Sequence, residues 1–385
     1  MWRASARSLS LGFLLAAAAC SDRPVVQESV ASGETASALE QAVNRMMSDT
    51  ALQAATGFTA STLVAPGTLS DPLALVAHAQ GVWVNDGGRE DGERGGEIFE
   101  VDKRGRATRI LDTGRTRPLG GFGLAPAGFG AFGGQIFALV QPRDGARGAQ
   151  ADHVLLRWPT PQSAPVEVCS VPTQGALDPA VPGGGISLVF GPAEGPFADR
   201  LFAAISALNT VFELQPTGRC EPFVTLGTNG WERPLAMAFS PAGDRLLLGA
   251  QRAGPATPRG VVLQIAADGR IDRDLAADGV EPVWAMAIAP ASFAGYAGEL
   301  FLTAGDPPRD LVGQVSNGAL YRVTGNRTRV VVAAGFLRPT GLAFVGDSLW
   351  VADARGRRVA GQRLPDGFIV AIRPEAASAP RPALE

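Results

Sequence analysis

The stretch Ser348-Leu-Trp-Val-Ala-Asp353 decides the fold, because five variants of it occur elsewhere in the chain. In chain order the variants are Gly81-Val-Trp-Val-Asn-Asp86, Gln135-Ile-Phe-Ala-Leu-Val140, Arg200-Leu-Phe-Ala-Ala-Ile205, Arg245-Leu-Leu-Leu-Gly-Ala250 and Glu299-Leu-Phe-Leu-Thr-Ala304. Each is a short apolar run with the composition of a β-strand. Their starts lie roughly 45 to 65 residues apart, which is the length of one propeller blade.

Companion strands stand in a fixed order around each of these runs. A strand rich in Ala and Gly comes before it: Leu73–Ala77, Gly121–Pro126, Gly185–Phe190, Leu235–Ser240, Trp284–Ala289 and Thr340–Phe344. Small side chains there indicate the innermost strand, because propeller blades crowd around their common axis. Another strand follows it: Glu97–Val101, His153–Trp158, Val211–Leu214, Val261–Ile265, Ala319–Val323 and Phe368–Ile372.

Fourth strands follow in five of the units, among them Thr108–Leu111, Val166–Ser170, Phe223–Leu226 and Arg329–Ala333. The sixth unit runs into a Pro-rich tail, so we expect Thr59–Val64 to complete it and to leave no open sheet edge between first and last blade. Lys103-Arg-Gly105 and Ala267-Asp-Gly269 fit the hairpin turns between third and fourth strands. The sequence therefore predicts an all-β protein, a six-bladed β-propeller of four-stranded blades over residues 57–374.

The N-terminus predicts export. Arg3 and Arg7 precede the apolar stretch Leu9–Ala19, which is too short to span a bilayer and is typical of a signal peptide. Leu15-Ala-Ala-Ala-Ala-Cys20 resembles a bacterial lipobox, in which the Cys is lipidated. We expect residues 1–19 to be a lipoprotein-type signal peptide and Cys20 to anchor the protein on the periplasmic side of the envelope. Secretion of a soluble protein is the alternative.

The segments beside the propeller have a different composition. Residues 20–56 predict a tether with a short amphipathic helix, because apolar pairs recur there at helical spacing. Residues 375–385 are rich in Ala and Pro and predict a disordered tail. The net charge of −3 and the lack of a basic stripe outside Arg355–Arg358 argue against nucleic acid as a partner. Contact with a membrane is expected through the lipid anchor alone.

The phrase Leu337-Arg-Pro-Thr-Gly-Leu-Ala-Phe-Val-Gly-Asp-Ser-Leu-Trp-Val-Ala-Asp353 is similar to the opening of an NHL-type blade. The chain thus resembles a superfamily that includes NHL-repeat proteins, gluconolactonase-type enzymes and quinone-dependent sugar dehydrogenases. The second resemblance implies a metal-dependent lactonase-like hydrolase in which Asn209, Asp306 and Asp353 hold a divalent cation such as Ca²⁺, although the Glu of the first blade has no counterpart. The resemblance to quinone-dependent sugar dehydrogenases implies a catalytic His with Arg and Lys, a pattern that His78, His153 and Lys103 do not reproduce.

A propeller presents its ligand site on the face where second strands end and innermost strands begin, here called the mouth. The polar and aromatic residues expected there are Asn85, Asp86, Gln141, Asn209, Trp231, Glu232, Gln251, Trp284, Asp306 and Asp353. They suit a polar small molecule that stacks on aromatic rings, such as a sugar, or a partner protein. The competing interpretation is structural: Asp86, Asp306 and Asp353 cap loops, and Trp231 and Trp284 pack between blades.

Cys169 and Cys220 form an even pair once Cys20 is set aside, and an oxidising compartment permits a disulfide between them. Both lie toward the outer edge of neighbouring blades, where blades splay apart and Cα atoms separate beyond bridging distance. The sequence alone does not decide whether Cys169 and Cys220 form a disulfide.

Overall fold

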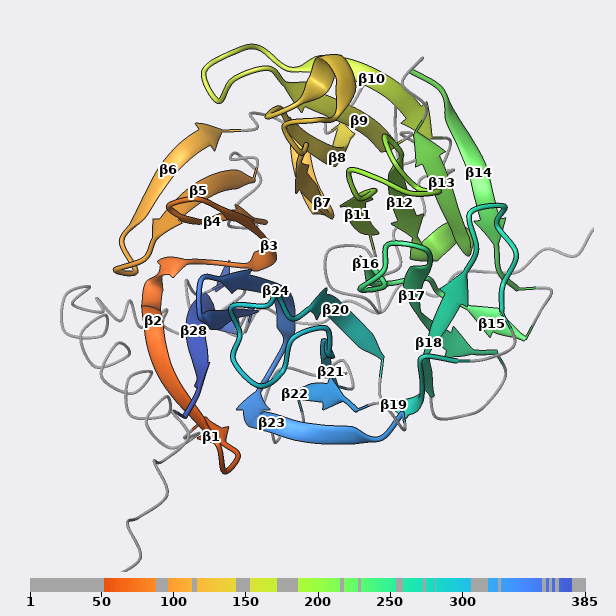
Figure 1. The fold of residues 1–385 in the computed structure, drawn as a ribbon. Helices are drawn as coiled ribbons and strands as arrows, with labels where there is room; N and C mark the ends of the chain where they lie inside the picture. The colour runs from red at the N-terminus through yellow and green to blue at the C-terminus, as the bar shows by residue number, and fades with distance from the viewer. Residues whose placement is uncertain are drawn as a thin grey trace, which may run out of the picture. The chain divides into compact units, whose positions relative to one another are not determined.

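The computed structural model describes residues 52–87, 96–112, 116–142, 153–171, 186–214, 218–227, 230–253, 259–272, 275–280, 282–305, 318–324, 327–354, 358–359, 362–363 and 367–375. Within these ranges six antiparallel sheets stand in a ring around one axis (Figure 1). The prediction of a six-bladed β-propeller is confirmed. The expected signal peptide, Cys20 and almost all of the expected tether and tail lie outside the described residues. No helix in the described ranges is long and apolar enough to cross a membrane.

The first three blades follow one another in chain order, each from its innermost strand outward. Blade 1 consists of β3 (Pro72–His78), β4 (Gly81–Asp86), β5 (Glu97–Asp102) and β6 (Ala107–Asp112). Blade 2 consists of β7 (Thr116–Leu124), β8 (Ile136–Pro142), β9 (His153–Trp158) and β10 (Val166–Val171). Blade 3 consists of β11 (Ile186–Phe190), β12 (Leu201–Ile205), β13 (Thr210–Leu214) and β14 (Cys220–Thr225).

The last three blades carry additions to this plan. Blade 4 has its innermost strand in two pieces, β15 (Trp231–Glu232) and β16 (Met237–Phe239), followed by β17 (Leu246–Arg252), β18 (Gly260–Ile265) and β19 (Ala277–Val280). Blade 5 has β20 (Val283–Ile288), β21 (Leu300–Ala304), β22 (Gly318–Val323), β23 (Arg329–Phe336) and, at its outer edge, β1 (Gln53–Ala54). Blade 6 has β24 (Pro339–Val345), β25 (Ser348–Asp353), β28 (Gly367–Pro374) and β2 (Phe58–Leu69). A short hairpin of β26 (Arg358–Val359) and β27 (Gln362–Arg363) lies between β25 and β28.

The ring is closed by the N-terminal strand, as the sequence predicts. β2 pairs antiparallel with β28 along the outer edge of blade 6, so the first strand of the propeller completes its last blade. The chain also joins blade 5 just before this, because Gln53 and Ala54 of β1 pair with Ala334 and Ala333 of β23. Residues 53 and 54 thus belong to a sheet, although the sequence places them in the tether.

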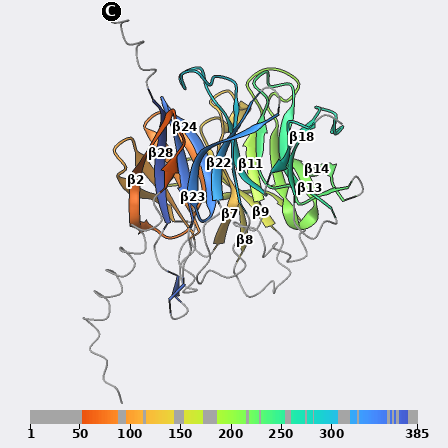
Figure 2. The same cartoon turned by 90° about the horizontal axis from the view of Figure 1, so that it is seen from below.

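The apolar core is divided into six layers, one between each pair of neighbouring blades. Alternate residues of a strand point to opposite faces of its sheet, so one strand serves two layers. In β25, Leu349 and Val351 pack toward blade 5, whereas Trp350 and Ala352 pack toward blade 1. Seen edge-on, the blades stand side by side around the axis (Figure 2).

Close packing at the axis explains the small residues of the innermost strands. A Cβ atom on Gly341 of β24 would lie 2.9 Å from Cγ and 3.1 Å from the backbone nitrogen of Leu75 on β3. Backbone of the neighbouring blade cannot give way as the end of a side chain can, so this position requires Gly. Gly105 and Gly269, which the sequence assigns to hairpin turns, have φ of 82° and 83° and satisfy the left-handed geometry of those turns.

Cys169 of β10 and Cys220 at the start of β14 form a disulfide, with their Cα atoms 6.0 Å apart. The splaying of neighbouring blades is therefore not large enough here to separate the two cysteines. Both sulfur atoms belong to the apolar layer between blades 2 and 3, so the bond joins the outer strands of two blades that share a core layer.

We predict that the double substitution Cys169→Ser with Cys220→Ser lowers the free energy of unfolding by about 2–4 kcal/mol, because the bond closes a loop of 51 residues in the unfolded chain. Chemical denaturation of the oxidised wild type, the reduced wild type and the double variant measures this. Equal stability of all three would contradict it.

Candidate functional site at the mouth of the axial cavity

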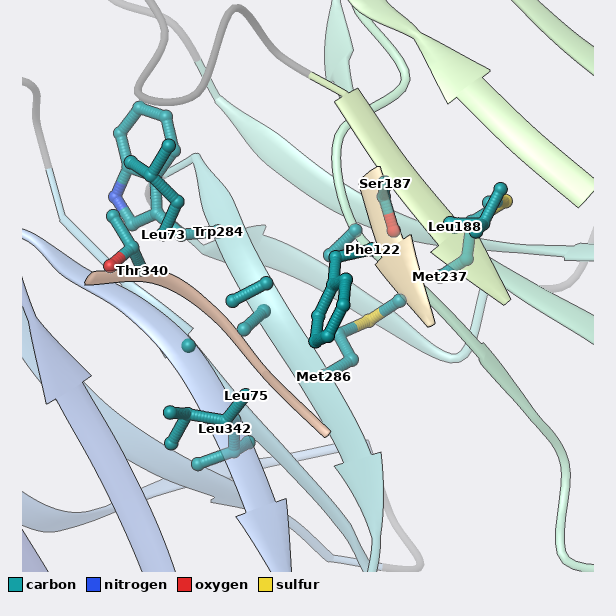
Figure 3. A pocket seen from close by; sticks show the side chains of 14 residues that line it. Leu73, Leu75, Phe122, Ser187, Leu188, Met237, Trp284, Met286, Thr340 and Leu342 are labelled. Atoms are coloured by element: carbon teal, nitrogen blue, oxygen red, sulfur yellow. The ribbon is translucent and has the colours of Figure 1, made fainter. Parts of the chain in front are cut away.

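The six innermost strands enclose a cavity of about 120 Å³ on the propeller axis (Figure 3). Every blade contributes to its wall, which consists of Leu73, Ala74, Leu75, Phe122, Ser187, Leu188, Ala236, Met237, Trp284, Ala285, Met286, Thr340, Gly341 and Leu342. Most of these side chains are apolar, and the two hydroxyl groups among them belong to Ser187 and Thr340. The cavity is thus narrow, and the edges of the innermost strands also present backbone groups to it.

Three β-bulges shape the mouth end of this cavity. The register between the innermost strand and its partner shifts between Pro72 and Ala74 in blade 1, between Val283 and Ala285 in blade 5, and between Pro339 and Gly341 in blade 6. The extra residues are Leu73, Trp284 and Thr340, respectively. Since a bulge bends its strand and redirects a side chain, all three reach the cavity, where Figure 3 places them beside one another.

Hydrogen bonds fix two of these side chains. The indole Nε1 of Trp284 donates to the carbonyl oxygen of Gly305 at 3.0 Å, which sets the plane of the ring. The Thr340 hydroxyl donates to the carbonyl oxygen of Pro72 at 2.5 Å and so joins blade 6 to blade 1. Directly before these strands, the Arg338 guanidinium lies 3.7 Å from the Asp71 carboxylate. The mouth end therefore combines a fixed, partly exposed indole with a nearby ion pair.

Asp86 and Asp353 occupy equivalent positions at the ends of β4 and β25, and both are buried. The two carboxylate oxygens of Asp86 accept the backbone N–H groups of Asp71 and Ser70 at 2.7 and 2.8 Å. Those of Asp353 accept the N–H groups of Arg338 and Leu337 at 2.8 and 2.9 Å. Both residues therefore hold the loop that enters the innermost strand of their own blade, which is the capping interpretation of the sequence.

Asn209 has a similar role between two blades. It follows the short 3₁₀ turn Ser206–Leu208 and adopts a left-handed φ of 52°, a conformation that Asn tolerates better than most residues. Its Oδ1 accepts the backbone N–H of Arg233 at 2.7 Å. Asn209 thus links blade 3 to the entry of blade 4.

The other predicted residues are distributed along the mouth. The guanidinium of Arg252 covers the ring of Trp231, with its Cζ 4.8 Å from the ring centroid, and also pairs with Asp278. Asn85 and Gln251 are buried in their strands, and Glu232 is half-buried opposite Gln251. Asp306 and the side chain of Gln141 lie outside the described residues. Among the predicted site residues that the structure describes, Trp284 is the one that lines the axial cavity.

The oxygen ligands expected for a divalent cation do not converge in the described part of the chain. Asp353 and Asn209 direct their oxygens to backbone N–H groups, and neither lines the cavity. The described residues contain no group of three or more His, Cys, Asp or Glu side chains that could hold a metal ion. Asp353 and Asn209, the two expected ligands that the structure describes, therefore do not form the cation site of gluconolactonase-type propellers.

The two histidines lie away from the cavity. His78 is at the far end of β3, where its Nε2 lies 3.5 Å from Glu100. Burial lowers the pKa of His78, and the Glu100 carboxylate opposes this shift. His153 is buried at the start of β9, opposite Val171. Neither occupies the position over the axis that a dehydrogenase-type catalytic His requires.

Comparisons with solved structures find the same fold. An auxiliary nutrient binding protein from Bacteroides ovatus is 10% identical over 84% of this chain and 78% of its own, with a TM-score of 0.52. A luciferin-regenerating enzyme is 10% identical over 82% of this chain and 95% of its own, with a TM-score of 0.51. Virginiamycin B lyase from Staphylococcus aureus is 12% identical over 82% of this chain and 99% of its own, with a TM-score of 0.47.

No family model and no curated protein sequence match the chain. At an identity of 10%, the likeness to the nutrient binding protein and the luciferin-regenerating enzyme shows the fold alone.

The sequence did not identify Leu73 and Thr340 as residues of the cavity, because a regular innermost strand was assumed in each blade. A signal was present: each residue directly follows a proline, Pro72 or Pro339, that marks the entry to a blade. Proline cannot donate to a sheet ladder and is often found at the start of a strand or at a bulge.

We predict that Asp353→Ala lowers the free energy of unfolding by about 2–4 kcal/mol, because it leaves two backbone N–H groups without their charged acceptor. Asp353→Asn retains one acceptor oxygen and is expected to cost about half as much. Asp347→Ala, at a carboxylate that is 81% exposed, serves as control and should change stability by less than about 0.5 kcal/mol. Unfolding curves of both Asp353 variants that coincide with the wild-type curve would contradict the capping role.

Proposed function

We propose that this protein is an exported, lipid-anchored propeller that binds a polar small molecule at the mouth end of its axial cavity. The observation that carries the proposal is the position of Trp284, which is partly exposed, lines the cavity and is held in place by its bond to Gly305. A fixed aromatic ring at the opening of a cavity is a common feature of ligand sites. The neighbouring Arg338–Asp71 pair supplies polar groups beside the opening.

Binding is favoured over metal-assisted hydrolysis by the use of the mouth carboxylates. Asp86 and Asp353 are buried and hold loop backbone, so they are not directed at a reacting centre. The Bacteroides ovatus neighbour is an auxiliary nutrient binding protein, which agrees with a binding role, although the proposal rests on the cavity.

The Cys169–Cys220 disulfide supports export, because such bonds persist in oxidising compartments and are rare in the cytosol. Together with the lipobox-like residues before Cys20, it favours a protein anchored on the periplasmic side of the envelope.

We expect a screen of polar small molecules by thermal shift to yield ligands that raise the melting temperature of the wild type. Trp284→Ala should remove the shift, and Trp231→Ala should retain it, because the Trp231 ring is covered by Arg252. Hydrolysis of lactones or sugar esters by the purified protein, dependent on a bound divalent ion, would instead establish the lactonase-like alternative.

For the anchor, we expect the wild type expressed in a Gram-negative host to incorporate labelled fatty acid and to sediment with membranes. Cys20→Ser should lose the label, because it removes the acylated thiol. A wild-type protein recovered unlabelled from the soluble periplasm would favour plain secretion.

A further inference from the structure

A groove on the face opposite the mouth is lined by charged side chains. It measures about 370 Å³ and lies at the hairpin turn that joins β5 to β6 in blade 1, beside the turn between β3 and β4. The lining consists of Gln80, Asp102, Lys103, Arg104 and Arg106. Since three of these side chains are cations and one is a carboxylate, the groove carries an excess of two positive charges.

The carboxylate of the groove is used by the turn itself. Oδ1 of Asp102 accepts the backbone N–H groups of Arg104 and Arg106 at 2.9 and 3.0 Å, and its Oδ2 lies 3.3 Å from Nε of Arg106. The hydrogen bond from the Arg106 backbone is the main cause of the lowered pKa of Asp102. Glu100 of β5 does not line the groove and lies 3.5 Å from Nε2 of His78. Asp102 thus offsets one of the three cations, and the groove remains positive.

The turn of blade 1 does not need its cations in order to form. Residues 102–106 and the equivalent residues 266–270 of blade 4 have the same backbone hydrogen bonds: the first residue donates its N–H to the fifth and accepts that of the fourth. The second and third positions hold Lys103 and Arg104 in blade 1 but Ala267 and Asp268 in blade 4. Because one turn geometry forms with either pair, the backbone does not explain the two cations of blade 1.

The groove at the blade 4 turn shows how such cations are balanced elsewhere on this face. Two arginines and two aspartates contribute to its lining. Arg245 and Arg270 lie 2.9 and 3.0 Å from the Asp272 carboxylate, and Arg245 also pairs with Asp244. Charge there is neutralised within the protein, whereas the blade 1 groove keeps its positive excess.

The blade 1 turn is also held firmly in place. Gly105 lies against the outer strand β2 of blade 6, where the carbonyl oxygen of Leu63 leaves no room for a Cβ atom, and Figure 1 shows the turn beside β2. A backbone that is already fixed does not have to be ordered when a ligand binds, so less entropy is lost on binding.

We propose that this groove is a second binding site and that it takes a phosphate group. A phosphate monoester carries a charge of about −1.5 to −2 at neutral pH and three strong acceptor oxygens. These match the excess of two positive charges and the N–H donors of Lys103, Arg104 and Gln80. The site is separate from the proposed ligand site on the axis, because the groove and the mouth lie at opposite ends of blade 1.

The test is a titration of inorganic phosphate against the full-length protein, followed by phosphorus NMR at an ionic strength of about 10 mM, where the Debye length is about 30 Å. We expect a dissociation constant on the order of 1 mM. Lys103→Gln combined with Arg104→Gln should weaken binding about tenfold, because it removes both charges and the donors of the guanidinium. Trp284→Ala should bind phosphate as the wild type does.

The matched control is Arg219→Gln combined with Arg270→Gln. It removes the same net charge from two exposed or charge-paired turns on the same face and should leave phosphate binding unchanged. Equal binding by the wild type and the Lys103/Arg104 double variant, or an equal loss in that variant and in the control, would overturn the inference.

A second arm identifies the source of the phosphate. The wild type and the Lys103/Arg104 double variant are sedimented with vesicles of phosphatidylglycerol or of phosphatidylcholine, so that a lipid anchor contributes equally to both lipids. A preference for phosphatidylglycerol that the double variant loses assigns the groove to lipid headgroups. Equal sedimentation with both lipids, or a preference that the double variant retains, assigns it to soluble phosphate esters.

Discussion

The structure depends on the burial of both faces of every blade. Each sheet packs its two faces against the sheets before and after it, so the core is a closed series of six apolar layers. A strand in the middle of such a sheet cannot alternate apolar and polar residues. This is why Leu201–Ile205 and Leu300–Ala304 are buried at every position. The same requirement makes the ring hard to open, because separating two neighbouring blades would expose both faces of the layer between them to water.

Closure of the ring determines how much space remains at the axis. Six innermost strands meet there, and the close approach of Gly341 to Leu75 leaves no room for a Cβ atom at that position. Bulges in blades 1, 5 and 6 then place Leu73, Trp284 and Thr340 in the remaining space. The candidate site is therefore a consequence of local irregularities in otherwise repetitive strands.

The polar residues at the mouth are used largely by the fold itself. Loops that enter the innermost strands bring backbone N–H groups into a buried region, and such groups need acceptors. Asp86, Asp353 and Asn209 supply them. A residue type suited to binding metal or sugar therefore serves here to hold successive blade entries in place, and among the described site residues Trp284 is the one that lines the cavity.

The sequence by itself determined the number of blades, the order of strands within them and the closing strand, because these follow from apolar periodicity and turn residues that are local in the chain. It also marked Trp284 as a residue of the mouth. Only the tertiary structure decided that Asp86 and Asp353 cap loops, that Arg252 covers Trp231, and that Cys169 reaches Cys220. Each of these depends on how far strands shift in register and how closely separate blades approach. Such distances are set by packing between residues far apart in the chain, and no local pattern encodes them.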